Sequence, residues 1–234
     1  MRAIKFILST LILTGCANVN ATPNYSRVTI LDDEEYVHDN GPEVYISQQE
    51  IKDDIAQLTD TVKKKTFDQR YFDKSFHSET DNTEGDTYMK PYVKAVKFLF
   101  DFPGVSHAIT AYSVGASPAG AYVNGKWSAV AEYFDSPELG ACTVKIWNMS
   151  EVKGEIIFNR KFVTYKVNNK PTIFMAHGNP EDGYYYNLSW ADNDFNSELI
   201  CANKKHDPKA EDKMIAAAKK IDKLIKLPVG LRGK

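Results

Sequence analysis

The stretch that decides the fold class is Ala121-Tyr122-Val123-Asn124-Gly125-Lys126-Trp127-Ser128. A two-residue hairpin turn needs positive φ at both central positions, and Asn-Gly is a pair that adopts this geometry readily. The residues on either side include the β-branched and aromatic side chains that are typical of strands. The sequence therefore predicts two antiparallel strands joined at Asn124 and Gly125.

The same strand signals continue on both sides of this hairpin, over residues 105–204. Short runs rich in Val, Ile, Tyr, Phe and Trp alternate with turn residues at hairpin spacing, which favours an antiparallel meander. Asn168-Asn169 predicts a second tight turn. We expect further strands at residues 130–134, 143–149, 156–167, 172–177, 184–190 and 198–202.

A capping box predicts that a helix begins at Ser47. Ser47 and Glu50 have the spacing of the box, and Ile46 and Ile51 are placed to form a hydrophobic staple around it. The expected apolar stripe of this helix is Ile51, Ile55, Leu58 and Val62. The helix is expected to end near Lys65-Thr66.

A second helix is expected near the C-terminus, with Asp207 as N-cap and Pro208 in the first turn. Its apolar stripe is Met214, Ala218, Ile221 and Ile225, and it is expected to end at Leu227-Pro228. Its lysines are expected to face water near the end of the helix, where positive charge complements the helix dipole. Residues 91–101 favour a further helix, although their apolar residues also alternate as in a strand.

Together these elements predict an α+β fold. The expected architecture is a curved antiparallel β-sheet meander, covered on one face by the helices beginning at Ser47 and near Asp207. We expect a single domain over residues 46–227, preceded by a lipidated N-terminus and polar spacer at 16–45 and followed by a tail at 228–234. The 234-residue chain is long enough for one hydrophobic core.

The N-terminus has the parts of a bacterial signal peptide. Residues 1–5 carry the basic Arg2 and Lys5, residues 6–13 are mostly apolar, and Thr14-Gly15 provides the small residues that a signal peptidase requires. The apolar run is far shorter than the roughly 20 residues of a membrane-spanning helix. The alternative is that these features belong to an ordinary secretory signal that contains a cysteine.

Leu13-Thr14-Gly15-Cys16 resembles the lipobox of bacterial lipoproteins. The resemblance implies cleavage before Cys16, a thioether-linked diacylglycerol on its sulfur and acylation of its new amino group. Two or more acyl chains hold a protein stably on a membrane. Ala17 follows the cysteine instead of Asp, which in lipoproteins of two-membrane bacteria favours the outer membrane, facing the periplasm.

The charge balance gives no sign of a nucleic-acid partner. Removing residues 1–15 takes Arg2 and Lys5 from the 29 basic residues, so 27 remain against 31 acidic residues, a formal charge of −4. A nucleic-acid-binding domain usually has a basic surface. We therefore expect partners of other classes.

Cys142 and Cys201 remain once Cys16 is lipidated. In a protein exported to an oxidising compartment, a disulfide is the expected fate of such a pair. A metal pair and a nucleophilic cysteine are the alternatives, and the lack of CxxC spacing argues against the metal. We expect no metal site and no cofactor.

The segment Gly115-Ala116-Ser117-Pro118-Ala119-Gly120 is similar to the elbow that exposes a nucleophilic serine, with His107 or His177 as a potential partner. The elbow needs a glycine two residues after the serine, where this chain has Ala119. Pro118 precedes a strand-like run instead of a helix. Ser117 is therefore expected to be a turn residue, and no catalytic residue is assigned.

Two polar loops contain potential ligands. Asp192-Asn193-Asp194-Phe195-Asn196 begins like a calcium loop, but Ser197 replaces the required glycine and Asn203 replaces the bidentate glutamate. A hairpin loop is the preferred interpretation. Residues 177–183 contain His177, Glu181 and Asp182, and they are expected to form a surface loop between strands.

Tyrosine is the most promising source of a binding surface, since the chain has 13 of them. Tyr184 and Tyr186 share one strand face with Leu188 and Trp190 and are expected to pack into the core, whereas Tyr185 projects to the other face. Tyrosine combines a large contact area with a polar tip. The candidate binding surface is Tyr184, Tyr185, Tyr186 and His177, for an envelope protein, glycan or lipid.

These features favour a lipid-anchored cell-envelope lipoprotein whose domain is a non-catalytic binding or structural module. It would contact the membrane through the lipid on Cys16. One alternative is an envelope hydrolase that acts on cell-wall or lipid substrates. Another is an accessory subunit of an envelope secretion or assembly complex.

Overall fold

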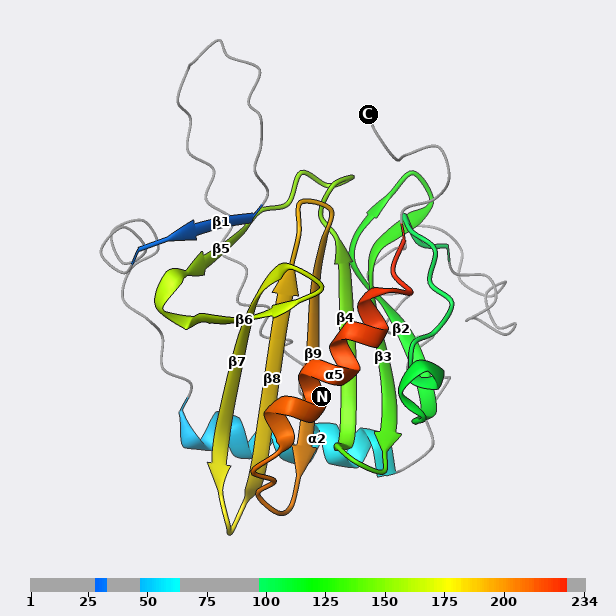
Figure 1. Cartoon of the computed structure of the whole chain (residues 1–234). Helices are drawn as coiled ribbons and strands as arrows, with labels where there is room; N and C mark the ends of the chain where they lie inside the picture. The colour runs from blue at the N-terminus through cyan, green and yellow to red at the C-terminus, as the bar shows by residue number, and fades with distance from the viewer. Residues whose placement is uncertain (1–27, 33–46, 64–96, 227–234) are drawn as a thin grey trace.

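The computed structural model describes residues 28–32, 47–63 and 97–226. Their centre is a seven-stranded antiparallel sheet with the order β2-β3-β4-β9-β8-β7-β6 (Figure 1). The strands are β2 (Tyr112–Val123), β3 (Lys126–Ser136), β4 (Gly140–Asn148), β6 (Val163–Val167), β7 (Lys170–Asn179), β8 (Gly183–Ala191) and β9 (Phe195–Asn203). With two helices packed against this sheet, the chain is an α+β protein.

The seven strands form two meanders and not the single one expected. The strands β2-β3-β4 and β6-β7-β8-β9 each run in order, and the ladder between β4 and β9 joins the two sets. The chain leaves the sheet after β4 because the side chain of Asn148 stabilises a turn. Its Oδ1 accepts hydrogen bonds from the N–H groups of Ser150, at 3.0 Å, and Glu151, at 3.4 Å.

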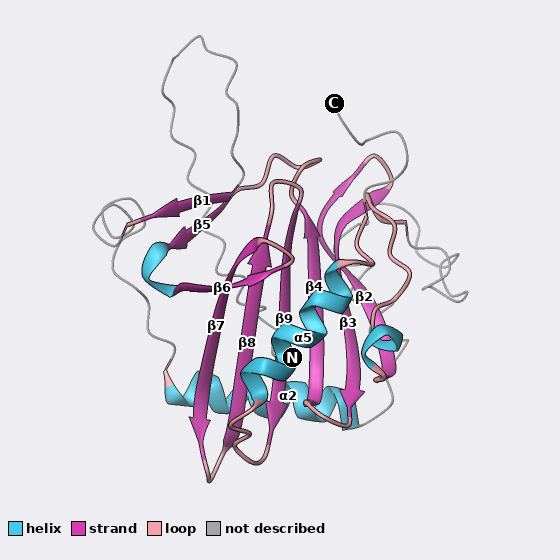
Figure 2. Cartoon of the chain, viewed as in Figure 1, coloured by secondary structure: helices cyan, strands magenta, loops and turns pink. Residues whose placement is uncertain are grey.

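The expected strand at residues 156–167 is divided. It comprises β5 (Ile156–Asn159), the 3-10 helix η3 (Arg160–Phe162) and β6 (Figure 2). The first of these pairs in parallel with β1 (Val28–Leu31) in a separate two-stranded sheet. Part of the segment expected to be a polar spacer is therefore a strand. Arg160 Nε lies 2.6 Å from Oδ1 of Asp32, the residue that follows β1.

Both predicted tight turns are confirmed. Asn124 and Gly125 have φ of 51° and 76° and connect β2 to β3. Asn168 and Asn169 have φ of 47° and 70° and connect β6 to β7. Positive φ at both central residues is the geometry of a primed hairpin turn, in which the turn twist matches that of the strands.

The two helices lie on opposite faces of the sheet, so the expectation of a single covered face is wrong. In Figure 1, α5 (Ala210–Asp222) crosses in front of the sheet and α2 (Gln48–Lys63) crosses behind it. Residues 127–134 of β3 are buried without alternation. A strand buried continuously in this way has both of its faces covered.

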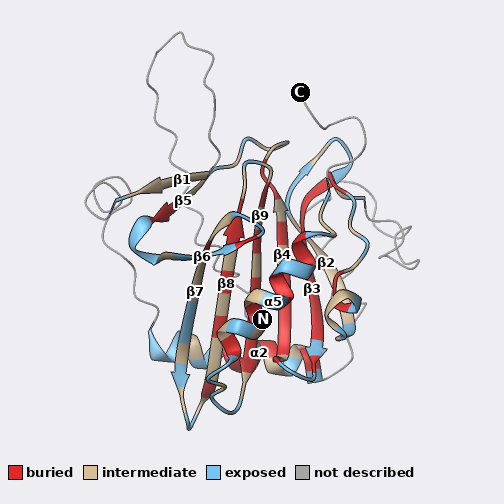
Figure 3. Ribbon diagram, in the orientation of Figure 1, coloured by how far each residue is buried: buried red, intermediate tan, exposed pale blue. Residues whose placement is uncertain are grey.

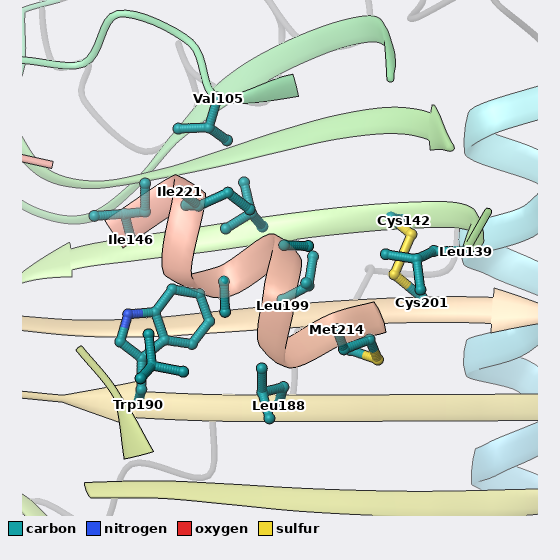
Figure 4. Close-up of a cluster of buried hydrophobic side chains, with 14 of the residues drawn as sticks. Val105, Leu139, Cys142, Ile146, Leu188, Trp190, Leu199, Cys201, Met214 and Ile221 are labelled. Carbon is teal, nitrogen blue, oxygen red and sulfur yellow. A yellow bond between two sulfur atoms is a disulfide. The ribbon is translucent and has the colours of Figure 1, made fainter. Parts of the chain in front are cut away.

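Each helix covers a separate apolar cluster. Ile55, Leu58 and Val62 of α2 pack on Ala131, Tyr133, Ala141, Ile200 and Ala202. The larger cluster lies under α5 (Figure 4), where Met214, Ala218 and Ile221 pack with Phe134, Cys142, Val144, Ile146, Leu188, Trp190 and Leu199. These contacts define an α2 face and an α5 face of the sheet.

The capping box at the start of α2 is confirmed. The N–H of Glu50 donates to Ser47 Oγ at 3.2 Å, and the N–H of Ser47 donates to Glu50 Oε2 at 2.8 Å. The bond from the Ser47 backbone, followed by the Ser47 side chain, lowers the pKa of Glu50. Ile46 of the expected staple and the expected helix end at 65–66 lie outside the described residues.

Replacing Ser47 by alanine is expected to lower the free energy of unfolding by about 1 kcal/mol, because the Glu50 N–H loses its acceptor. Urea denaturation followed by circular dichroism measures the change. The matched control is Gln57→Ala, an exposed position in the middle of the same helix. Equal midpoints for the two variants would show that the cap contributes nothing.

Two other helix predictions need correction. The C-terminal helix begins at Ala210 with Lys209 as its N-cap, because Asp207 Oδ1 accepts from the N–H of Lys209 at 2.9 Å and forms a preceding turn. Residues 97–101, the described part of the expected 91–101 helix, are not helical. Their backbone instead bonds to Trp127, with the Trp127 N–H donating to the Lys97 carbonyl at 2.8 Å. Residues 227 onward, with the expected end of the C-terminal helix, lie outside the described part.

Candidate functional site

A hollow of about 370 Å³ lies between the first turn of α2 and the turn end of the β7–β8 hairpin. The hollow is lined by Gln48, Ile51 and Lys52 from the helix and by Ala176, His177, Gly178, Asn179 and Asp182 from the hairpin. Its volume lies in the lower part of the range of ligand pockets. It can therefore hold a small ligand or a few side chains of a larger one.

The side chain of Asn179 fixes the turn that forms one wall. Its Oδ1 accepts hydrogen bonds from the N–H groups of Glu181, at 2.8 Å, and Asp182, at 2.9 Å. Its Nδ2 donates to Asp182 Oδ2 at 3.1 Å. An asparagine that bonds to the backbone two residues later is a common turn device. Here it also orients the Asp182 carboxylate.

An ion pair connects this turn to the helix. Lys52 Nζ lies 2.9 Å from Asp182 Oδ1. The hydrogen bond to Asp182, followed by its charge, raises the pKa of Lys52, and the bonds from Lys52 and Asn179 lower the pKa of Asp182. Exposed pairs of this kind contribute little to stability. The pair therefore connects the first turn of α2 to the hairpin without adding much stability.

Of the residues in the candidate binding surface, only His177 lines the hollow. It is half-buried and lies opposite Tyr185 in the β7–β8 register. The hollow thus combines an imidazole, the amides of Gln48 and Asn179, and the apolar side chain of Ile51. Polar and charged side chains outnumber the apolar ones, Ile51 and Ala176, so the lining suits non-covalent binding through hydrogen bonds.

The structure does not bring the three tyrosines of the candidate surface together. Tyr186 is 2 % exposed in the core on the α5 face, as its place in the strand predicts. Its hydroxyl accepts from the N–H of Asp207 at 3.0 Å. Tyr184 packs against the same core, whereas Tyr185 packs on the α2 cluster, where burial and then the Glu198 and Asp54 carboxylates raise its pKa.

A row of polar side chains crosses the centre of the α2 face. Lys145 Nζ lies 3.4 Å from Glu198 Oε2, and Asn187 Nδ2 donates to Glu198 Oε1 at 2.7 Å. Burial raises the pKa of Asp54 on the helix above them, and the nearby Lys145 ammonium partly opposes this. Lys145, Asn187 and Glu198 thus contact one another beneath the helix, whereas Asn187 Oδ1 is buried without a hydrogen-bond partner among the described residues.

The residues considered for hydrolysis are kept apart. Ser117 lies within β2 and pairs with Ala131, so its expected role as a turn residue is wrong. Strands β3, β4, β9 and β8 separate β2 from β7. At a spacing of about 4.8 Å between neighbouring strands, β2 and β7 are about 24 Å apart across the sheet, which keeps Ser117 away from His177.

His107 is not placed to act on Ser117 either. It is exposed in the 3-10 helix η2 (Ser106–Ile109), which packs on the α5 side through Ile109. Ser117 lies on the opposite, α2 face of the sheet, because it is aligned with Ala131 of the α2 cluster. Gly120, with φ of 74°, accommodates the irregular register near this part of the strand.

The loop with calcium-like spacing forms the β8–β9 turn. Asp192 Oδ1 accepts from the N–H groups of Asp194 and Phe195, each at 2.8 Å. Asp192 Oδ2 lies 2.7 Å from Lys170 Nζ. The Asp192 carboxylate therefore has partners within the protein, in agreement with the hairpin interpretation.

Cys142 and Cys201 face each other across β4 and β9 at disulfide distance, with their Cα atoms 4.1 Å apart. Both belong to the α5 cluster, and neither has exposed surface. Cys16 lies outside the described residues. Within those residues, no three His, Cys, Asp or Glu side chains gather as they would around a metal ion.

Sequence reasoning missed the helical half of the hollow. Ile51 was expected only to belong to the apolar stripe, and no feature of the sequence linked Ile51 or Lys52 to His177. The capping box locates the first turn of α2 accurately along the chain. It contains no information on which hairpin that turn will meet, because the contact is between segments far apart in the sequence.

Comparison with protein-family models, with curated proteins and with solved structures found no match for this chain. In the ranges that the structure describes, no helix has the length and apolar character needed to cross a membrane.

Proposed function

We propose that this chain is a lipid-anchored protein of the bacterial cell envelope whose domain acts as a non-catalytic binding module. The observation that carries the proposal is Leu13-Thr14-Gly15-Cys16, in register with the basic and apolar parts of a signal peptide. Lipidation of Cys16 would tether the mature chain, most simply to the outer membrane on its periplasmic side. The tether would concentrate the domain near the membrane.

The buried cysteine pair supports export. Disulfides persist in oxidising compartments such as the periplasm and are rare in the cytosol. Cys142 and Cys201 lie directly opposite one another on neighbouring strands. Such a pair is compatible with the compartment to which a lipoprotein signal would deliver the chain.

The hollow beside α2 supports binding as the role of the domain. Its lining offers hydrogen-bonding groups around Ile51, on a wall that Asn179 and the Lys52–Asp182 pair hold in place. Pre-formed sites of this kind lower the entropic cost of binding. The serine and histidines on which the hydrolase alternative depends lie apart.

The anchor is tested by Cys16→Ser in a two-membrane bacterium. We expect the wild type to gain acyl mass and to sediment with membranes, and the variant to lose both properties. Intact mass spectrometry and membrane fractionation measure them. Asn20→Ser is the matched control, because it introduces the same residue outside the lipobox and should keep the lipid. A wild type that is soluble and without acyl mass would disprove the anchor.

A further inference from the structure

One edge of β7 is only partly paired. On one side, β8 pairs with β7 from Thr172 to Asn179. On the other side, β6 pairs with it only from Lys170 to Ile173. No strand among the described residues pairs with residues 174–179 on that second side. Met175 is 37 % exposed, Ala176 and Gly178 are exposed, and Figure 3 shows the lower half of β7 largely in the colour of exposed residues.

The hairpin turns determine which backbone groups point to this free edge. A two-residue turn at Asn168-Asn169 makes Val167 and Lys170 the closing pair across β6 and β7, where the Val167 N–H donates to Thr172 Oγ1 at 3.0 Å. Along an antiparallel strand, successive residues direct their backbone groups to alternate sides. The N–H and C=O groups of Phe174 and Ala176 therefore point outward, like those of Lys170 and Thr172, whereas Gly178, with φ of 130°, departs from the regular strand.

The chain itself cannot extend β6 along this edge. η3 comes directly before β6, and the Lys161 N–H donates to Asn159 Oδ1 at 3.0 Å to hold that turn. The residues that would continue β6 opposite Phe174 are thus directed away from β7. The open part of the β7 edge begins where its pairing with β6 ends. Its backbone donors and acceptors continue the row to which β6 is paired.

The first turn of α2 lies beside this open edge on the α2 face. In Figure 1, the N-terminal end of α2 reaches beyond β7. The hollow lies between this turn and residues 176–179. A strand added along β7 would place alternate side chains towards Ile51 and Gln48. The other side chains would lie on the α5 face beside Ala176 and Gly178, which leave room for them.

We propose that the free edge of β7 binds an extended segment of another protein as an added antiparallel strand, with one or two of its side chains in the hollow, where hydrogen-bonding residues outnumber apolar ones. The proposal rests on the function proposed above and names its ligand. Main-chain hydrogen bonds give affinity in this mode of recognition, and pockets for alternate side chains give specificity. Pairing antiparallel to β7 follows the direction of β6.

A second copy of the chain is a poorer occupant. Pairing of two β7 edges about a twofold axis would bring two copies of the α2 first turn to the same face of the joined sheet. The positive ends of both helix dipoles would then approach each other. A single extended peptide has no such element and can use the full length of residues 174–179.

Peptide selection with a backbone variant tests the proposal. The probe is a displayed library of ten-residue linear peptides, selected on the purified mature protein in detergent. Ala176→Pro removes one outward N–H and leaves the ladder to β8 intact, because proline is tolerated where the N–H faces away from the sheet. Ala176→Ser, the control, keeps the N–H and adds only a hydroxyl group. We expect at least tenfold weaker binding for Ala176→Pro and less than a twofold change for Ala176→Ser.

Amide hydrogen exchange provides a readout that does not depend on the variant being folded. In the free protein, the amides of Phe174 and Ala176 should exchange faster than those of Met175 and His177, which bond to β8. A selected peptide should slow exchange at Phe174 and Ala176. Failure to select any peptide, equal affinity for the two variants, or protection elsewhere would each overturn the proposal. So would protection of these amides by self-association, seen in sedimentation. Membrane partition of Cys16→Ser tests the anchor separately.

Discussion

Replacing Asp222 by alanine is expected to lower the free energy of unfolding by about 3–5 kcal/mol, the range for removing one member of a buried charged pair. Asp222 is only 8 % exposed at the end of α5. Its Oδ1 accepts from Lys170 Nζ at 2.6 Å and from the Trp190 indole N–H at 3.0 Å. Its Oδ2 accepts from Asn168 Nδ2 at 3.0 Å.

The large effect follows from the groups that would lose their acceptor. Trp190 is almost fully buried, so water cannot readily replace the carboxylate at its indole N–H. Burial alone lowers the pKa of Lys170, but hydrogen bonds to Asp192 and Asp222 outweigh it and raise the pKa. The lysine therefore remains charged in the folded protein and would keep only Asp192 as its partner.

Urea denaturation of matched variants measures this contribution. Asp222→Asn keeps an acceptor oxygen and is expected to lose less stability than Asp222→Ala. Lys220→Ala, at an exposed position in the same helix, should change the free energy of unfolding by less than about 0.5 kcal/mol. A change of this small size for Asp222→Ala would show that the contacts of Asp222 with Lys170, Trp190 and Asn168 do not stabilise the fold.

Local signals in the sequence predict local structure accurately in this chain. Asn124-Gly125, Asn168-Asn169 and the Ser47–Glu50 capping box each involve residues within one turn, and all three are present in the structure. Strand order is different, because β4 pairs with β9 through contacts between distant segments. The cross-strand partners of a strand are not encoded in its own turn residues. A meander is therefore the simplest prediction, and it is correct only within each half of the sheet.

The error about helix placement has a sequence signal that the prediction did not use. Residues 127–134 are Trp-Ser-Ala-Val-Ala-Glu-Tyr-Phe, which lacks a clean alternation of polar and apolar residues. Such a run favours a strand covered on both sides. The observed placement of α2 and α5 satisfies this requirement, because each helix buries one of the two sets of side chains.

The candidate site was predictable only in its hairpin half. The alternation of residues in β8 correctly separates Tyr186, in the core, from Tyr185, on the opposite face. It also places His177 near the end of its strand. Lys52 becomes part of the site through its ion pair with Asp182. Nothing in the amphipathic pattern of α2 distinguishes that lysine from the other charged residues on the exposed side of the helix.

Removing the disulfide by the double substitution Cys142→Ala and Cys201→Ala is expected to lower the free energy of unfolding by about 2–5 kcal/mol. The two residues are separated by 59 positions. On the chain-entropy model, a loop of this size corresponds to about 4 kcal/mol. The covalent bond also joins β4 to β9, the ladder that unites the two meanders.

Burial of both cysteines adds a kinetic expectation. Because neither has exposed surface, a reductant should reach the disulfide only when the ladder opens. The native protein should therefore keep the bond in dithiothreitol, and the same reductant should lower the urea midpoint of the wild type once unfolding begins. The double variant serves as the control, since its midpoint should not respond to dithiothreitol. If the oxidised wild type and the double variant unfold at the same urea concentration, the bond does not stabilise the junction. The two meanders would then be held together by the hydrogen bonds of the β4–β9 ladder and by the apolar contacts under α5.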